Sequence, residues 1–182
     1  REHGIERLIH TSTSEVYGTA RQVPIGEAHP LQAQSPYSAS KIGADKLAES
    51  FYNSYDLPVV TLRPFNTYGP RMRPEDGRVV SNFIVQALRG EDITIYGDGS
   101  QTRSFCFVDD LIEGFVRLMN SPRSVTGPIN LGNPGEFTIR ELAEQVIDLT
   151  GSPSRIVYRP LPVDDPRQRR PDIAVASREL DW

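Results

Sequence analysis

Tyr37 and Lys41 are the residues whose types and spacing most clearly suggest chemistry, because they stand four positions apart in the segment PYSASK. On a helix this spacing places the phenol and the ammonium on one face. A phenol ionises near pH 10 in water, so it serves as a base at neutral pH only where a nearby positive charge favours the phenolate. Lys41 would supply that charge. The pair therefore predicts a base that removes the proton of a hydroxyl group.

A row of hydroxyl groups and one carboxylate precedes this pair, in the segment TSTSEVYG at residues 11–18. These residues follow a short apolar run with strand character, and open α/β sheets bind ligands at the carboxyl ends of their strands. We expect Thr13 to hold the substrate hydroxyl that Tyr37 deprotonates. Glu15 is a candidate acid, and the alternative is a surface carboxylate at the end of a strand.

The elements that must position these residues alternate between helices and short apolar strands, which predicts an α/β sheet with helices on its faces. Two helices carry cap signals: Asp109 is expected to cap one, and Thr138 with Glu141 forms a capping box for another. The predicted helices cover 36–55, 79–88, 109–119 and 139–149, with a last helical turn towards residue 182. The predicted strands are a buried one within 4–13, then 57–62, 93–96, 105–108, 128–131 and 155–158.

Composition excludes several classes of protein. The chain has 182 residues, 37% hydrophobic and 24% charged, with 20 Lys and Arg against 24 Asp and Glu. This is ordinary globular composition, and the net charge of -4 argues against a nucleic-acid partner. No apolar run approaches the roughly 18 residues that span a bilayer, so we expect no membrane partner and a cytoplasmic location. The single cysteine, Cys106, excludes a disulfide within the chain and fits a reducing compartment. The three histidines stand apart from it, which leaves no ligand set for a structural metal.

Four motifs in a fixed order strengthen the reading of the Tyr-Lys pair: TSTSEVYG, PYSASK, RPFNTYGP and GDGSQTRSF. Together they resemble the extended short-chain dehydrogenase/reductase family of nucleotide-sugar epimerases, dehydratases and decarboxylases, over residues 4–182. The resemblance implies the C-terminal part of a Rossmann-like doubly wound parallel sheet with an interleaved small α/β substrate-binding domain. Residues 1–64 would be the C-terminal half of the NAD-binding domain and 65–182 mainly the substrate-binding domain, with 109–132 returning to the Rossmann sheet.

The resemblance also implies a reaction that uses tightly bound NAD. In that family the Tyr removes the proton of the sugar 4-hydroxyl while hydride passes to the nicotinamide, which gives a 4-keto sugar. The matching catalytic positions here are Thr13, Tyr37 and Lys41. Thr11 and Pro64, together with the Tyr-Lys pair, would contact the cofactor.

The residues beside Thr13 resemble those of one branch of the family. Dehydratases that act on dTDP-glucose carry Asp-Glu there, whereas the pair Ser14-Glu15 is similar to that of UDP-glucuronate decarboxylases. The resemblance therefore makes Ser14 and Glu15 further candidate catalytic residues. Further positions in the second half of the chain resemble the decarboxylase pattern for gripping a nucleotide sugar, and Arg guanidinium groups suit its anionic oxygens. These expected substrate-binding residues are Asn66, Arg71, Arg78, Tyr96, Arg103 and Arg169. For Arg71 a solvated surface position is an equal alternative, and for Tyr96 a place in the core.

Decarboxylation of UDP-glucuronate to UDP-xylose, a lyase reaction, is therefore the first interpretation. The stretch around YSASK is more similar to 4,6-dehydratases that act on N-acetylated sugar nucleotides, so that activity is an alternative. A 4-epimerase is another, disfavoured because it has no need of an acid at Glu15. A nucleotide-sugar-binding module without chemistry is the non-enzymatic alternative.

One departure from the family pattern concerns the cofactor. The glycine-rich turn that cradles NAD has no counterpart in this sequence, because Gly132 and Gly135 read only as a turn. About one hundred residues of the usual N-terminal half-sheet are therefore expected to be missing, and the 182 residues alone should bind NAD poorly and turn over little. The resemblance also implies a homodimer through helix 36–55, whose Ile42, Leu47 and Phe51 face either a second copy or their own sheet.

Overall fold

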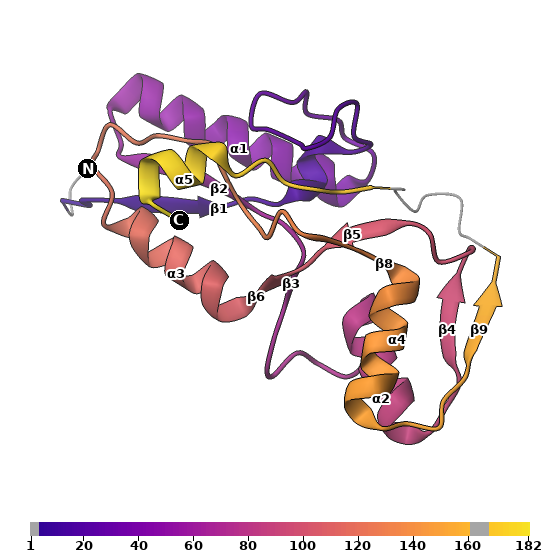
Figure 1. Cartoon of the computed structure of the whole chain (residues 1–182). Coiled ribbons are helices and arrows are strands. Elements are labelled where there is room, and N and C mark those ends of the chain that lie inside the picture. Colours follow the sequence, from indigo (N-terminus) through magenta and orange to yellow (C-terminus); the bar gives the residue numbers. More distant parts are fainter. Residues whose placement is uncertain (1–3, 161–167) are drawn as a thin grey trace.

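Helices and strands alternate in the computed structural model, which describes residues 4–160 and 168–182 (Figure 1). The helices are α1 (Pro36–Tyr55), α2 (Val79–Arg89), α3 (Val108–Met119), α4 (Ile139–Thr150) and α5 (Ala174–Leu180), and a 3-10 turn, η1, covers Ser14–Tyr17. The strands are β1 (Leu8–Thr11), β2 (Val59–Pro64), β3 (Thr67–Tyr68), β4 (Ile93–Tyr96), β5 (Thr102–Ser104), β6 (Cys106–Phe107), β7 (Ile129–Leu131), β8 (Glu136–Thr138) and β9 (Ile156–Arg159). The predicted α/β class is confirmed. No helix in the described residues is long and apolar enough to cross a membrane.

A three-stranded parallel sheet in the order β1-β2-β7 forms the first part of the fold. The central strand β2 is a run of β-branched and apolar residues, which suits a strand covered on both faces. Helix α1 lies on one face of the sheet and α3 on the other, with α5 against β7 (Figure 1). Gly114 permits the close approach of α3, because a Cβ there would stand 2.5 Å from a methyl carbon of Leu131. The buried core between these elements consists of Val60, Leu62, Cys106, Leu111, Leu118, Val125, Ile129, Leu131, Ala176 and Leu180.

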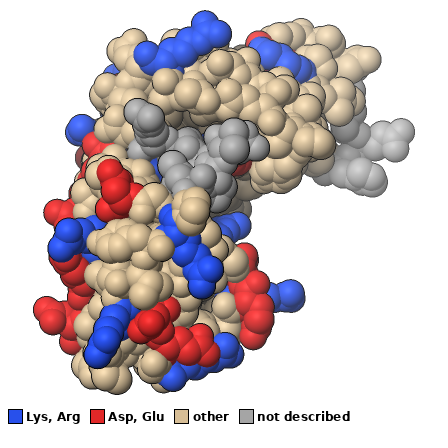
Figure 2. Space-filling model, turned by 90° about the vertical axis from the view of Figure 1, so that its right-hand side faces the viewer, with Lys and Arg blue, Asp and Glu red and all other residues tan. Residues whose placement is uncertain are grey.

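The second part of the fold places α2 and α4 against a parallel pair of strands, β4 and β9 (Figure 1). The pairs β3–β6 and β5–β8 connect it to the first part. The predicted capping box of α4 is confirmed: Thr138 Oγ1 accepts from the Glu141 amide at 3.0 Å, and the Glu141 carboxylate accepts from the Thr138 amide at 2.7 Å. The separate core here consists of Phe83, Ala87, Ile93, Ile95, Ile139, Ala143 and Val146. On the face drawn in Figure 2, acidic and basic side chains are interspersed over this part.

Three local predictions were wrong. Asp109 is not a cap, because α3 begins at Val108 with Phe107 at its N-cap, and Asp109 lies in the first turn, where a carboxylate still favours the helix dipole. The predicted strand 105–108 is divided, since β5 ends at Ser104, β6 holds two residues and the next residue is already helical. The strand within 4–13 is not buried: among the described residues β1 pairs with β2 alone, and Leu8 is 42% exposed.

Helix α1 directs polar rather than apolar side chains at the sheet. Its buried residues are Ser38 and Asp45, whereas Leu47 and Phe51 are exposed. Of the two orientations that the sequence left open, these two side chains do not face their own sheet. Ile42, by contrast, is partly buried against the cluster around Val16 and Phe65.

Candidate active site

The first turn of α1 presents Tyr37 and Lys41. Ser35 and Ser38 form a reciprocal capping box, with Ser38 N donating to Ser35 Oγ at 3.1 Å and Ser35 N to Ser38 Oγ at 3.0 Å. The helix therefore begins at a fixed residue, and the half-exposed Tyr37 follows Pro36 in its first turn. One turn later, Lys41 Nζ lies 6.0 Å from the centroid of the Tyr37 ring. The phenol and the ammonium share one face, as the spacing predicted.

Lys41 also joins α1 to the end of β1. Its Nζ donates to the carbonyl oxygen of Thr11 at 3.1 Å. Thr11 is the last residue of β1, and Pro64 is the last residue of the neighbouring strand β2. The structure thus brings the four positions expected to contact a cofactor to the carboxyl end of the parallel sheet or to the helix beside it, where open α/β sheets bind ligands.

The turn η1 directly after β1 holds Thr13, Ser14 and Glu15. Thr13 is the N-cap of η1, and its Oγ1 accepts from the Glu15 amide at 3.2 Å. Ser14 is buried, whereas the side chain of Glu15 is 44% exposed. The hydroxyl and the carboxylate therefore lie on one short, capped turn.

Arg169 is the partner of Glu15. Its Nη1 donates to Oε1 in a short contact, and its Nη2 lies 3.4 Å from Oε2, so the guanidinium faces both carboxylate oxygens. Arg169 itself is buried, with 8% of its surface exposed. A buried Arg that faces a carboxylate with two nitrogens forms a geometrically specific pair. This places one expected substrate-binding residue at the turn that holds Thr13 and Glu15.

Four other expected substrate-binding residues line one cavity of about 310 Å³ between α2 and strands β3 to β5: Asn66, Arg78, Tyr96 and Arg103. Arg103 is buried, and its Nη1 donates to the Thr102 carbonyl at 2.8 Å. Tyr96 is 49% exposed on the cavity wall, so the alternative of a core tyrosine was wrong. The cavity combines guanidinium groups, an amide and an aromatic ring, which are the groups that recognise an anionic nucleotide.

Arg71 is placed differently from the other expected residues. It is exposed, is not among the residues that line this cavity, and has a left-handed backbone with φ of 67°. The structure therefore agrees with the solvated alternative for Arg71 in this conformation.

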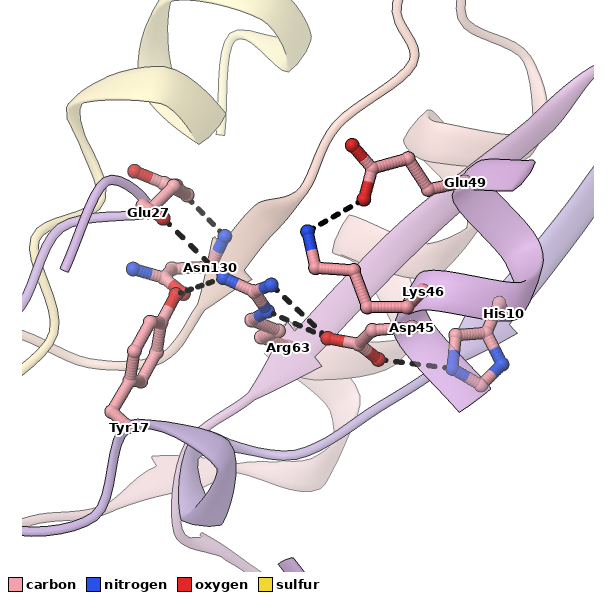
Figure 3. Close-up of polar contacts among 8 residues, drawn as sticks. All are labelled: His10, Tyr17, Glu27, Asp45, Lys46, Glu49, Arg63 and Asn130. Carbon is pink, nitrogen blue, oxygen red and sulfur yellow. Dashed lines mark hydrogen bonds and ion pairs between the residues drawn. The ribbon is translucent and has the colours of Figure 1, made fainter. Parts of the chain in front are cut away.

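Sequence analysis missed a buried polar network around Arg63 (Figure 3). Arg63 and Asp45 form an ion pair, with Nη2 at 3.0 Å and Nε at 3.1 Å from Asp45 Oδ2. Both side chains are almost fully buried. A signal was present in the sequence, because Arg63 interrupts the apolar strand run VVTLRP, and a charge buried in a strand requires a partner.

Two groups of this network extend it on either side (Figure 3). His10 Nε2 lies 3.1 Å from Asp45 Oδ1. Tyr17 accepts from Arg63 Nη1 at 3.1 Å and donates to the side-chain oxygen of Asn130 at 2.6 Å. Burial raises the pKa of the Tyr17 phenol, so it remains a neutral donor at physiological pH.

No group of three or more His, Cys, Asp and Glu side chains able to hold a metal ion is found within 4–160 and 168–182. The groups that converge at the carboxyl end of the sheet are instead a phenol, an ammonium, hydroxyls and one carboxylate paired with a guanidinium. Such groups move protons and bind anions.

The sequence of the chain matches a known protein family. Residues 1–132 match the model of the NAD dependent epimerase/dehydratase family. The chain belongs to this family. The predicted resemblance is therefore confirmed, and family members use the cofactor that the sequence predicted, NAD.

Among curated members of the epimerase/dehydratase family, the chain is similar to decarboxylases. It is 49% identical over 181 residues to UDP-glucuronic acid decarboxylase 4 of Arabidopsis thaliana, covering 97% of this chain and 40% of that protein. It is 45% identical to UDP-glucuronic acid decarboxylase 1 of Danio rerio, covering 97% of this chain and 43% of that protein. The chain thus spans less than half the length of these two relatives.

Solved structures of epimerase/dehydratase members have the same fold. A UDP-N-acetylglucosamine 4-epimerase from Methanobrevibacter ruminantium M1 superposes with a TM-score of 0.94 at 31% identity, over 100% of this chain and 58% of that one. A UDP-glucuronic acid 4-epimerase from Bacillus cereus, solved with UDP-glucuronic acid and NAD, superposes with a TM-score of 0.88 at 31% identity, over 97% of this chain and 56% of that one. The predicted Rossmann-like class is confirmed.

Proposed function

We propose that the protein decarboxylates UDP-glucuronate to UDP-xylose, using NAD to form and later reduce a 4-keto sugar. The observation that carries the proposal is the pairing of Glu15 with Arg169 directly beside Thr13. The guanidinium can hold the sugar carboxylate, and the neighbouring Glu15 carboxylate repels the negative charge that is lost as carbon dioxide leaves. The similarity to named UDP-glucuronic acid decarboxylases supports this choice of substrate.

The residues at the end of the sheet fit the reactive end of NAD, because Tyr37 and Lys41 are accessible beside the carboxyl end of β1. Thr11, Tyr37, Lys41 and Pro64 are the residues that would hold this end of the cofactor. When bound, NAD supplies the oxidation of sugar carbon 4 and its later reduction.

The first proton transfer in this proposal belongs to Tyr37. The Nζ of Lys41 lies 6.0 Å from the centre of the Tyr37 ring, and Tyr37 is assigned as the base that accepts the proton of the sugar 4-hydroxyl. Thr13, on the capped turn, holds that hydroxyl by a hydrogen bond. Once carbon 4 is a ketone, the bond between carbon 5 and the carboxyl carbon breaks, carbon dioxide leaves, and the electrons of that bond form an enolate whose oxygen the protonated Tyr37 stabilises by a hydrogen bond. Carbon 5 then takes up one proton from solvent, which gives the 4-keto pentose that is reduced at carbon 4.

The cavity beside α2 is the proposed site of the uridine diphosphate. Arg78 and Arg103 are assigned to the diphosphate oxygens, and Tyr96 and Asn66 to the nucleoside. A volume of about 310 Å³ is at the lower end of the usual range for ligand pockets. Arg71 has no assigned role here.

The proposed domain division follows the sheet. We assign residues 1–64 to the NAD-binding domain and 65–182 mainly to the substrate-binding domain, with 109–132 in the former. The parallel pairing of β7 with β2 and the packing of α3 against β1 support this return of the chain.

We also propose a homodimer, through the side of α1 that carries Leu47, Phe51 and Tyr55. All three are exposed at intervals of four residues, and the rings of Phe51 and Tyr55 are 5.6 Å apart. Sedimentation of Phe51→Glu beside the parent protein tests this, and an unchanged dimer would contradict it. For location we propose the cytoplasm, supported by a single buried cysteine that suits reducing conditions.

A 4-epimerase is the second candidate, because the solved structures with TM-scores of 0.94 and 0.88 are 4-epimerases. A nucleotide-sugar 4,6-dehydratase is a third, given a dTDP-glucose 4,6-dehydratase from Bacillus anthracis at a TM-score of 0.86. The three activities share the oxidation at carbon 4. A decarboxylase then removes carbon dioxide, a 4,6-dehydratase removes water, and a 4-epimerase removes nothing.

Mass spectrometry of the product tests the proposal. The full-length natural protein is incubated with NAD and UDP-glucuronate, and loss of one carbon dioxide is expected. Glu15→Gln should slow that loss more than the oxidation, so that reduced nicotinamide accumulates. The control is Glu49→Gln, which removes a carboxylate from an exposed ion pair with Lys46. A new species of unchanged mass that chromatography separates from UDP-glucuronate would establish an epimerase instead.

A further inference from the structure

The buried guanidinium of Arg63 bonds to Tyr17 of η1 and to Asp45 of α1 (Figure 3). Arg63, in β2, binds Asp45 through Nε and Nη2 and binds the Tyr17 hydroxyl through Nη1. Its side chain is only 6% exposed. Three of its nitrogens thus have fixed partners on two different elements.

Each partner belongs to an element that carries reacting groups. Tyr17 is the last residue of η1, the turn that begins after Thr13 and contains Glu15. Asp45 lies on α1, one turn after Lys41. The position of the hydroxyl-bearing turn relative to the Tyr-Lys helix is therefore set partly through Arg63.

The network continues from Tyr17 to Asn130, which restricts the movement of η1. The side-chain oxygen of Asn130 accepts from the Tyr17 hydroxyl, and its side-chain nitrogen donates to the Ile25 carbonyl at 3.0 Å. The backbone N–H of Asn130, in β7, donates to Glu27 Oε1 at 2.9 Å. Tyr17 and Asn130 are completely buried. Polar networks with satisfied members are rigid and specify one arrangement.

Stability alone does not account for this network. A buried ion pair often stabilises a fold no better than apolar residues of the same volume, because desolvation offsets the attraction between the charges. Catalysis, in contrast, depends on placement, since a misplacement of about 1 Å can cost about 100-fold in rate.

We propose that Arg63 is a positioning residue that holds Thr13 in register with the Tyr37–Lys41 pair, through Tyr17 and Asp45. Arg63 contacts no residue assigned to the reacting atoms, and its third partner, the Glu27 carbonyl at 3.4 Å, lies in the loop after η1. The inference rests on the proposed function in one respect, that the reaction begins with proton removal by Tyr37.

Tyr17→Phe is the sharpest test, because Arg63→Met leaves Asp45 buried without its partner and the variant can fail to fold. Phenylalanine keeps the ring contacts with Phe65 and His29 and removes only the hydroxyl. We expect kcat to fall by about 10- to 100-fold with KM nearly unchanged. We also expect a larger kinetic isotope effect with substrate deuterated at carbon 4, because the misaligned oxidation step becomes rate-limiting.

The matched control is Ser152→Ala, in the second part of the fold. Ser152 donates to the Ala87 carbonyl at 2.7 Å, so this variant also loses a partly buried hydroxyl bond, but at the ends of α2 and α4 rather than beside η1 (Figure 1). Both variants should melt at similar temperatures, while only Tyr17→Phe loses kcat. Equal kcat for Tyr17→Phe and the parent protein would overturn the inference, as would an equal loss in Ser152→Ala.

A failure of the proposed decarboxylation remains distinguishable from a failure of this inference. If the parent protein epimerises its substrate or removes water from it, the decarboxylase proposal is wrong, and the two variants are then compared on that reaction. Each of these reactions begins with the same proton removal, so the expected loss in Tyr17→Phe is unchanged.

Discussion

The guanidinium of Arg169 faces both carboxylate oxygens of Glu15, a residue 154 positions earlier in the chain. Two backbone hydrogen bonds next to it fix this long-range contact: Ile25 N donates to the Arg170 carbonyl at 2.8 Å, and Asp172 N donates to the Ile25 carbonyl at 2.9 Å. The C-terminal segment is thereby pinned against the loop that follows η1. The acid and the guanidinium therefore belong to one site.

Tyr37→Phe should remove activity and leave the fold intact. The side chain is half exposed, so the loss of one oxygen disturbs little packing. We expect kcat in the full-length natural protein to fall by about 100-fold or more, since the base is lost. Initial rates and thermal melting curves measure the two effects. Tyr158→Phe, at a half-exposed tyrosine in β9 without an assigned role, is the control, and substantial activity in Tyr37→Phe would refute the assignment.

Arg103→Lys should weaken the binding of UDP by about tenfold or more, because lysine keeps the charge but lacks the planar fork that grips two oxygens. Isothermal titration calorimetry with UDP alone measures this without turnover. Arg89→Lys, an exposed substitution at the end of α2, should bind UDP as the parent does. Equal affinity in both variants would show that the cavity does not hold the diphosphate through Arg103.

Leu118→Ala should destabilise the protein by about 2 to 5 kcal/mol, because Leu118 is fully buried in the core beneath the three-stranded sheet. Leu149, by contrast, is 88% exposed at the end of α4. Leu149→Ala should change stability by no more than about 0.5 kcal/mol. Urea unfolding of the two variants gives this comparison, and similar free energies would contradict the placement of α3.

The thiol of Cys106 should make the free energy of unfolding depend on pH in the alkaline range. Burial raises the pKa of its thiol to about 11, above that of an exposed thiol. Between these two pKa values the folded protein keeps a proton on the thiol that the unfolded chain releases. The contribution of the thiol to the free energy of unfolding is therefore complete below about pH 8.5 and is lost as pH rises towards about 11. Urea midpoints across this range should fall less in Cys106→Ala than in the parent protein. An identical slope in both would show that the thiol does not contribute.

Local sequence determined much of the secondary structure. Helix α1 has the predicted bounds, and the capping box of Thr138 and Glu141 is present, because such signals act between residues three or four positions apart. The same local geometry placed Tyr37 and Lys41 on one face. The order of four motifs was sufficient to predict the family, which the family model then confirmed.

Only the tertiary structure decided which distant groups meet. Nothing local in the sequence pairs Arg63 with Asp45 or Glu15 with Arg169, because each pair forms when separate elements pack together. Packing also decided which face of α1 is buried. The buried Arg63 requires a carboxylate on the helix face that covers it, so Asp45 rather than the apolar side chains lies against the sheet. Periodicity identifies the faces of a helix, whereas the charges of its neighbours determine which face is buried.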